Sequence, residues 1–256
     1  MVSVYSWNVN GIRAAAKKGL LDWIEKERPE ILCLQETKAR RDQLPSELAR
    51  PDGYHTYWAE ADKPGYSGVA LFTLYEPVSV EPLGVEAFDR EGRTLIADFG
   101  SFVFFGCYFP NSQEAGARLD YKLAYCNAVK ERADAYVAAG RHVLISGDFN
   151  IAHTPLDLAR PEANEKNPGY LPEEREWMTY FLSSGYVDTF RMFTKEGGHY
   201  TWWTYRFKAR EKDIGWRIDY HCVNEGFKDK VKESVILKNV MGSDHCPVKI
   251  TLDVEV

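Results

Sequence analysis

Short runs of branched and aromatic residues recur along the whole chain, and this feature most constrains its fold. Turn-forming residues bound each run, which is typical of β-strands. We expect strands at Val2–Trp7, Ile31–Leu34, Gly68–Thr73, Thr94–Phe99, Phe102–Tyr108, Val143–Ser146, Ile218–Val223 and Pro247–Leu252. Helical patterns are fewer, and proline or glycine ends each one: Leu20–Glu27, Leu119–Ala139 and Pro172–Ser184. Many short strands with few helices predict two stacked β-sheets flanked by helices.

The chain length and composition agree with one compact domain over residues 1–256. A hydrophobic content of 45% is enough for a substantial core. No linker, repeat or low-complexity tract divides the chain. The net charge of −6 argues against a protein that coats nucleic acid without selectivity. It does not exclude a DNA enzyme, because a local basic rim can lie beside an acidic metal site.

Cysteine usage and the apolar runs bear on where the protein works. The five cysteines are scattered, odd in number and without a CxxC pair, which favours reduced thiols over disulfides or a zinc site. No stretch approaches the roughly 20 apolar residues that cross a bilayer. The first residues also lack the pattern of a signal peptide. We therefore expect a cytoplasmic protein that has no membrane contact. A monomer is expected as well, although the sequence alone does not fix the oligomeric state.

Polar clusters stand at the ends of four predicted strands, where a sheet presents side chains into a shared cleft. They are Asn8 with Asn10, Gln35 with Glu36, Asp148 with Asn150, and Asp244 with His245. The alternative for each cluster is an ordinary turn or cap, because Asn and Asp bond their own backbone after a strand. The coexistence of all four favours a functional site, since turn chemistry does not require it.

Glu36 directly follows the apolar run ILCL, so its charge needs a cationic partner. The clusters supply mainly oxygen ligands. Such ligands suit Mg²⁺ or Mn²⁺ better than zinc, which prefers His and Cys. The pattern therefore predicts a magnesium-type site at the strand ends.

The same motifs resemble the exonuclease III class of abasic-site endonucleases, within the endonuclease/exonuclease/phosphatase superfamily. The resemblance runs end to end, through SWNVNGIRAA, LCLQETK, GYSGVAL, YFPN, GDFNIAH, YTWW, GWRIDY and GSDHCP. YFPN and GWRIDY point to the DNA-repair class, and YTWWTYR with GWRIDY looks closest to prokaryotic and archaeal members. The resemblance implies a DNase I-like, four-layer α/β sandwich.

The resemblance also implies roles for particular residues. Glu36 resembles the principal metal carboxylate, with Asn10 near the same ion. Asp148 resembles the group that positions or deprotonates the attacking water, and His245 resembles a phosphate-binding histidine oriented by Asp219. Further expected catalytic or phosphate contacts are Asn8, Tyr108, Asn111, Asn150 and Asp244. Asp148, Asn150 and Asp244 are also expected near the metal.

Substrate choice is expected to rest on a small apolar pocket and a basic rim. Trp202, Trp216 and Ile218 match the pocket for an extruded sugar that lacks its base. The alternative is core packing, because YTWWTY alternates like a strand. The expected DNA contacts are Arg13, Lys18, Tyr66, Asn164, Asn167 and Arg206, with Lys17, Lys208 and Arg210 in the same basic set. Solvated surface charge is the alternative for the basic residues.

These expectations together describe a Mg²⁺-dependent enzyme of base excision repair. It would cut duplex DNA 5′ to an abasic site and leave a 3′-hydroxyl. The resemblance implies accompanying 3′–5′ exonuclease and 3′-phosphodiesterase activities on 3′-blocked ends, and allows incision at deoxyuridine. Two alternatives stay open: a phosphatase on a small phosphorylated substrate, and a catalytically silent DNA-binding module.

Overall fold

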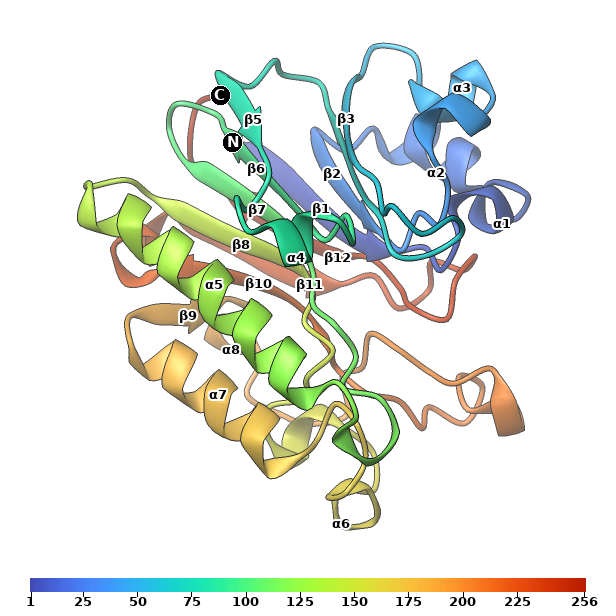
Figure 1. Ribbon diagram of the computed structural model, residues 1–256, viewed down its shortest axis with the longest axis vertical. Helices are drawn as coiled ribbons and strands as arrows, with labels where there is room; N and C mark the ends of the chain where they lie inside the picture. The colour runs from blue at the N-terminus through green and yellow to red at the C-terminus, as the bar shows by residue number, and fades with distance from the viewer.

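Two six-stranded β-sheets pack face to face in the computed structural model, which describes residues 1–256 (Figure 1). The first sheet has the order β11-β12-β1-β2-β4-β3, and the second has β5-β6-β7-β8-β10-β9. The strands of the first sheet are β1 (Val2–Asn8), β2 (Ile31–Gln35), β3 (His55–Ala59), β4 (Val69–Thr73), β11 (Val231–Ile236) and β12 (Val248–Leu252). Those of the second are β5 (Ser79–Glu81), β6 (Thr94–Asp98), β7 (Val103–Tyr108), β8 (Val143–Asp148), β9 (Tyr186–Asp188) and β10 (Asp219–Asn224).

Helices cover the outer face of each sheet, and this confirms the four-layer α/β sandwich. Helices α1 (Ile12–Ala16) and α2 (Leu20–Glu27) pack on the first sheet. Helices α5 (Leu119–Ala138) and α7 (Pro172–Ser183) lie side by side on the second (Figure 1). The remaining α-helices are one turn long: α3 (Ser46–Ala49), α4 (Glu86–Asp89), α6 (Pro161–Asn164) and α8 (Phe190–Phe193). Five 3-10 helices lie in the connections: η1 (Arg41–Gln43), η2 (Glu114–Gly116), η3 (Pro155–Asp157), η4 (Arg206–Lys208) and η5 (Glu225–Lys230).

Strand direction brings the polar strand ends to one edge of the sandwich. Strand β1 runs parallel to β2, and β7 runs parallel to β8, whereas the other neighbours are antiparallel. Parallel neighbours need a crossover, and α1 with α2 and then α5 supply the two crossovers. Within each parallel pair both carboxyl ends therefore lie at the same edge. The first sheet also joins the two ends of the chain, because β1 pairs with β12.

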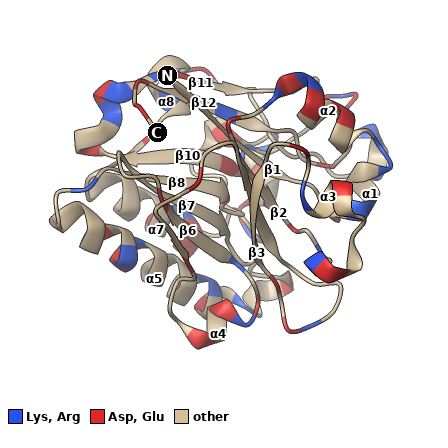
Figure 2. Ribbon diagram, turned by 90° about the horizontal axis from the view of Figure 1, so that it is seen from above, with Lys and Arg blue, Asp and Glu red and all other residues tan.

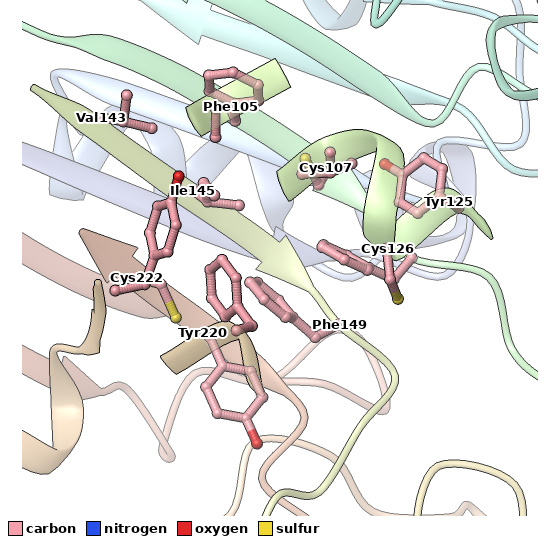
Figure 3. Close-up of a cluster of buried hydrophobic side chains, with 14 of the residues drawn as sticks. Phe105, Cys107, Tyr125, Cys126, Val143, Ile145, Phe149, Tyr220 and Cys222 are labelled. Carbon is pink, nitrogen blue, oxygen red and sulfur yellow. The ribbon is translucent and has the colours of Figure 1, made fainter. Parts of the chain in front are cut away.

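The hydrophobic core has one layer between the sheets and one beneath each set of helices. Along β8, Val143 and Ile145 face α5, whereas Leu144 points between the sheets. Figure 3 shows the layer under α5, where Phe105 and Phe149 lie among these side chains. Both faces of the central strands are thus buried, which explains why their sequences read as continuous apolar runs.

Charged residues lie mainly on the outer helices and loops, where both signs are interspersed (Figure 2). The central strands carry few charges in the same view. The few charged side chains buried between the sheets therefore need specific partners. None of the helices has the length and apolar character needed to cross a membrane.

The sequence did not predict four of the strands: β3, β5, β9 and β11. Each lies at an edge of its sheet, where one side of the strand faces solvent and polar residues are tolerated. Strands β5 and β9 span only three residues each, and β11 contains a register shift between Val231 and Glu233. Edge strands therefore lack the apolar runs that identified the central ones.

The tryptophan-rich segment 200–205 is not a strand, although its alternation resembles one. Trp202 makes only isolated bridges, to Trp216 and to His245. The alternation arises because Trp203 is buried in the core, whereas Trp202 is only partly buried and faces the other way.

Gly147 permits the close approach of β7 and β8 beside Asp148. Its φ is +151°, and a Cβ atom there would lie 1.8 Å from the carbonyl oxygen of Cys107. We expect Gly147→Ala to lower the free energy of unfolding by about 3 kcal/mol. The alanine would bear the strain of the positive φ, and its Cβ would also clash with the Cys107 carbonyl oxygen. Urea unfolding measures the loss.

Gly140 provides the matched control, because its φ is +78° but its Cβ would meet nothing within 4 Å. Gly140→Ala should cost only about 1 kcal/mol, for the left-handed backbone alone. Equal losses in the two variants would contradict the proposed clash.

Candidate active site

A cavity of about 690 Å³ opens at the edge where the carboxyl ends of the parallel strands meet. Most of the residues predicted for the site line its wall. They are Glu36, Tyr108, Asn111, Asp148, Asn150, Asn164, Asn167, Trp202, Trp216, Ile218, Asp244 and His245. The predicted Asn8, Asn10 and Asp219 lie behind this wall and hydrogen-bond to it. The fold therefore assembles strand ends that are far apart in sequence.

Asn8 links the two sheets at the base of the cavity. Its Nδ2 atom donates to Glu36 Oε1 at 2.8 Å and to Asp148 Oδ2 at 2.9 Å. Its Oδ1 atom accepts from the backbone N–H of Asn10. Asn8 and Asp148 are buried, so each contact replaces hydration that the carboxylates lose. One amide thus fixes a carboxylate from each sheet.

His245 is held between two carboxylates of the second sheet. Its Nδ1 lies 2.8 Å from Asp219 Oδ2, and its Nε2 lies 3.8 Å from Asp148 Oδ2. Asp148 and Asp219 are register partners on β8 and β10, which explains why one ring reaches both. Burial by itself lowers the pKa of His245, but the charges of Asp219 and Asp148 outweigh it and raise the pKa to about 10. The ring is therefore an imidazolium at neutral pH.

Asp148 has a protonation equilibrium near neutrality. Burial and the neighbouring charge of Asp219 raise its pKa to about 7, although His245 opposes the shift. A carboxylate of this pKa is suited to accept a proton from water. Tyr108 behaves differently, because burial and the charges of Glu36 and Asp148 hold its pKa well above 10. Its hydroxyl therefore stays protonated and is available as a donor.

Glu36 and Asn10 direct oxygen atoms at one cation, the ammonium of Lys38. Lys38 Nζ lies 2.9 Å from Glu36 Oε2 and 2.5 Å from Asn10 Oδ1. This confirms that Glu36 needs a cationic partner, and it shows that a positive ion fits between the two oxygens. Carboxylate oxygens of Glu36 and Asp148 also lie within 4.8 Å of each other, whereas the protonated His245 ring has no free nitrogen to offer a metal. The oxygen-rich donor set fits a hard divalent cation.

Asp244 is committed to protein contacts on both sides. Its Oδ1 accepts from Asn10 Nδ2 at 3.1 Å, and its Oδ2 accepts from the indole of Trp202 at 3.1 Å. The carboxylate therefore connects the cation-binding oxygens to the aromatic part of the cavity. Any direct contact with an ion must compete with these two donors.

The backbone around the site is strained at four residues that are not glycine. Asn10, Glu36, Lys38 and Asn150 have φ between +46° and +52°. Such values are uncommon outside glycine and collect at sites where the surroundings fix the chain. The turn after β2 is held by the Lys38 N–H, which donates to the Ser67 carbonyl at 2.8 Å.

Trp202 and Trp216 form an aromatic corner of the cavity. Their rings meet edge to face at 6.1 Å, and Ile218 packs in the same apolar cluster. Trp203 instead is buried and donates to Asp213. Core packing is thus the right interpretation for Trp203, and cavity lining is the right one for Trp202 and Trp216.

Asparagines frame the rest of the cavity. Asn150 donates to the Phe109 carbonyl at 2.9 Å, and Asn111 donates to Asn150 at 3.4 Å. Asn167 donates to Asn164 at 2.8 Å within the loop before α7. These side chains line the cavity.

Four predicted DNA contacts lie outside the cavity wall. Arg13 is exposed and donates to Gln43, and the Lys18 ammonium lies 5.7 Å from the ring centre of the exposed Tyr205. Arg206 is exposed in the loop that follows Trp203. Tyr66 is half-buried and accepts hydrogen bonds from two arginines behind the surface, Arg93 and Arg118.

Arg210 does not belong to a solvated basic set. Its guanidinium donates to the carbonyls of Ser243, Lys238 and Val240. It therefore anchors the loop that carries Asp244, which sequence alone could not show because these partners are about 30 residues away. Lys208 is exposed and pairs with Glu211.

Sequence reasoning missed two buried ion networks that hold the cavity wall. Lys122 donates to Glu174 and to the carbonyl of Asn150, and Glu174 accepts from the N–H groups of Gly169 and Leu171. In the second network, Arg217 pairs with Asp157 and Asp188. The sequence signals were that Lys122 shares a helix face with the apolar residues Tyr125, Cys126 and Val129, and that Arg217 stands beside Trp216.

Comparisons with known proteins agree with this fold. A family model described as the endonuclease/exonuclease/phosphatase family matches residues 5–245. An exodeoxyribonuclease of Bacillus subtilis is 40% identical, over 99% of this chain and 100% of the relative. A protein of Danio rerio named DNA repair nuclease APEX1 is 41% identical, over 99% of this chain and 83% of the relative. The solved structure of an AP endonuclease from Archaeoglobus fulgidus has a TM-score of 0.89 and 26% identity, covering 99% of this chain and 100% of that one.

Removing the charge of Asp219 tests the electrostatics of the histidine. We expect Asp219→Asn to lower the pKa of His245 from about 10, because only the charges of Asp148 and Asp244 then oppose the effect of burial. In the wild type, the raised pKa contributes stability that is fully present below pH 6.5 and lost as pH rises through about 10. In Asp219→Asn, the free energy of unfolding should fall less as the pH rises over this range.

An NMR titration of the imidazole and urea unfolding across this pH range provide the two measurements. Asp62→Asn is the control, because it removes an exposed carboxylate that pairs with Arg90. An unchanged pKa of His245 in Asp219→Asn would contradict the interpretation.

Proposed function

The chain belongs to the endonuclease/exonuclease/phosphatase family, and we propose that it is a DNA-repair nuclease that hydrolyses the backbone 5′ to abasic sites. The product would carry a 3′-hydroxyl. The observation that carries the proposal is the buried Asp148–His245–Asp219 group beside the Trp202–Trp216 corner. The names of the relatives, which include an exodeoxyribonuclease, a repair nuclease and an AP endonuclease, support the same assignment.

Each catalytic side chain has a role that its environment supports. Asp148, with a pKa near 7, accepts a proton from the attacking water. The His245 imidazolium donates to a phosphoryl oxygen, where negative charge increases in the transition state. Asp219 keeps the ring oriented and charged. Asn8 holds Asp148 in place, and the protonated Tyr108 supplies a further donor.

A divalent cation, which we propose to be Mg²⁺ with Mn²⁺ as a substitute, would be held by Glu36 and Asn10. When bound, such an ion stabilises negative charge on phosphoryl oxygens. Lys38 would have to yield its contacts with both residues. Asp148, Asn150 and Asp244 line the same cavity and complete the proposed metal environment.

The aromatic corner favours DNA over a small phosphorylated substrate. Enzymes that act on a nucleotide inside a duplex extrude it, and a missing base lowers the unstacking cost. Trp202, Trp216 and Ile218 offer an apolar surface for a bare deoxyribose, whereas a small phosphorylated polyol would need polar partners there. The complete set of buried charged groups argues against a silent binding module, because burying it without use costs stability.

We further propose that 3′–5′ exonuclease and 3′-phosphodiesterase activities use the same residues. The protein would act as a monomer, with residues 1–256 as one domain, on duplex DNA that carries abasic or 3′-blocked lesions. Arg13, Lys18, Tyr66 and Arg206 would contact the DNA backbone outside the cavity, where phosphate contacts fix the position of the duplex.

A duplex with a tetrahydrofuran abasic analogue tests the activity and its metal. With Mg²⁺ we expect cleavage 5′ to the analogue, and none in excess EDTA. Glu36→Gln should raise the Mg²⁺ concentration needed for half-maximal activity, because one anionic ligand is lost. Glu233→Gln is the matched control, since Glu233 is exposed on β11. Full cleavage in EDTA would refute the metal assignment.

Paired duplexes with the abasic analogue or deoxyuridine test the pocket. Abasic DNA should be cut faster, because extruding a paired uracil costs about a few kcal/mol more than extruding a bare sugar. We expect Trp202→Ala and Trp216→Ala to reduce this preference, since a wider pocket admits a base. Phe193→Ala, which alters an exposed ring outside the cavity, should keep it. Equal cleavage of both lesions, unchanged in the variants, would exclude gating by these tryptophans.

A further inference from the structure

A small cavity of about 10 Å³ lies between the two sheets, beside Asp219. Its wall includes Asp219 and His221 from β10, Ser234 from β11 and Val248 from β12. This volume is close to that occupied by one water molecule. A cavity of this size keeps a water only when at least two polar groups face it.

Two buried polar atoms of residues that line this cavity make no hydrogen bond of normal geometry within the protein, although the backbone of Val248 lies beside the His221 ring. They are Asp219 Oδ1 and His221 Nε2. The other polar atom of each side chain is satisfied, because Asp219 Oδ2 lies 2.8 Å from His245 Nδ1 and His221 Nδ1 lies 2.7 Å from Ser146 Oγ. A buried polar group without a partner costs about 1–3 kcal/mol, so both atoms require an explanation.

Strand geometry places the two unsatisfied residues on one face. Asp219 and His221 are two positions apart on β10, so both side chains point between the sheets and their Cα atoms are roughly 6.6 Å apart. That spacing is long for a direct hydrogen bond between the two side chains, and none is present. It suits a bridge through one water molecule.

We propose that this cavity holds one water molecule that joins His221 Nε2 to Asp219 Oδ1. His221 is then a positioning residue, which acts on the proposed hydrolysis only through Asp219 and His245. The water donates one hydrogen to the carboxylate. It accepts from His221 Nε2 if that nitrogen carries the proton, and donates to it if Nδ1 does, so either tautomer completes the bridge.

The bridge explains why a histidine occupies an interior strand position. Burial lowers the pKa of His221 to about 4, so the ring is neutral at neutral pH and adds no charge beside Asp219. A carboxylate held through both oxygens cannot rotate away from His245. Groups that orient a catalytic or metal-binding side chain in this way commonly change activity by about tenfold or more when removed.

Crystallography and kinetics test the site and the role separately. We expect a high-resolution structure of the wild type to contain the water, and that of His221→Phe to lack it, because the apolar ring offers no partner. With the abasic-analogue duplex, His221→Phe should lower kcat by roughly tenfold at unchanged KM. The NMR signal of the His245 Nδ1 proton should shift, because Asp219 loses its second contact.

His221→Gln keeps a polar group and should restore most of kcat and of the wild-type signal. Val223→Ala, a buried apolar change on the same face of β10, controls for lost stability and should leave kcat unchanged.

An empty cavity in the wild type would refute the proposed water site. An unchanged kcat and proton signal in His221→Phe would overturn the positioning role. The inference rests on the proposed function, yet inactivity of the wild type would refute only that function, because the water is observed without any assay.

Discussion

The burial of two aspartates on adjacent strands is the constraint on which the rest of the site depends. Asp148 and Asp219 are register partners, and both are almost inaccessible to water. Two like charges at this separation are unstable in a protein interior unless a cation or a proton accompanies them. His245 supplies the cation, and its high pKa and the raised pKa of Asp148 are two consequences of the same arrangement.

The sandwich makes this arrangement possible because each sheet contributes what the other lacks. The second sheet provides the two aspartates, whereas the first provides Asn8 and the segment before β12 that carries His245. Asn8 reaches across the interface to Asp148, and Trp7 of the same strand donates to the His245 carbonyl at 3.1 Å. Any shift of one sheet against the other would therefore separate Asn8 from Asp148.

Around this centre the cavity wall is made of loops, each fixed by polar contacts of a charged side chain. Lys122 and Glu174 hold the loop before α7, and Arg217 holds the chain beside Trp216. Arg210 holds the loop that leads to Asp244. These contacts cost desolvation energy, but they leave the cavity wall with few alternative conformations. Substrate selection through shape requires such a wall.

The sequence by itself determined the central strands and the residues that end them. Three central strands are buried on both faces: Val2–Asn8, Ile31–Gln35 and Val143–Asp148. The sequence alone therefore predicts their apolar runs and the polar residues that end them. Only the tertiary structure decided the partners: Asn8 with Asp148, Lys38 with Glu36, and Arg210 with the loop before Asp244. The edge strands also required the structure. The reason is physical, since burial leaves a periodic signal in the local sequence, whereas a contact between distant segments depends on the sheet register that joins them.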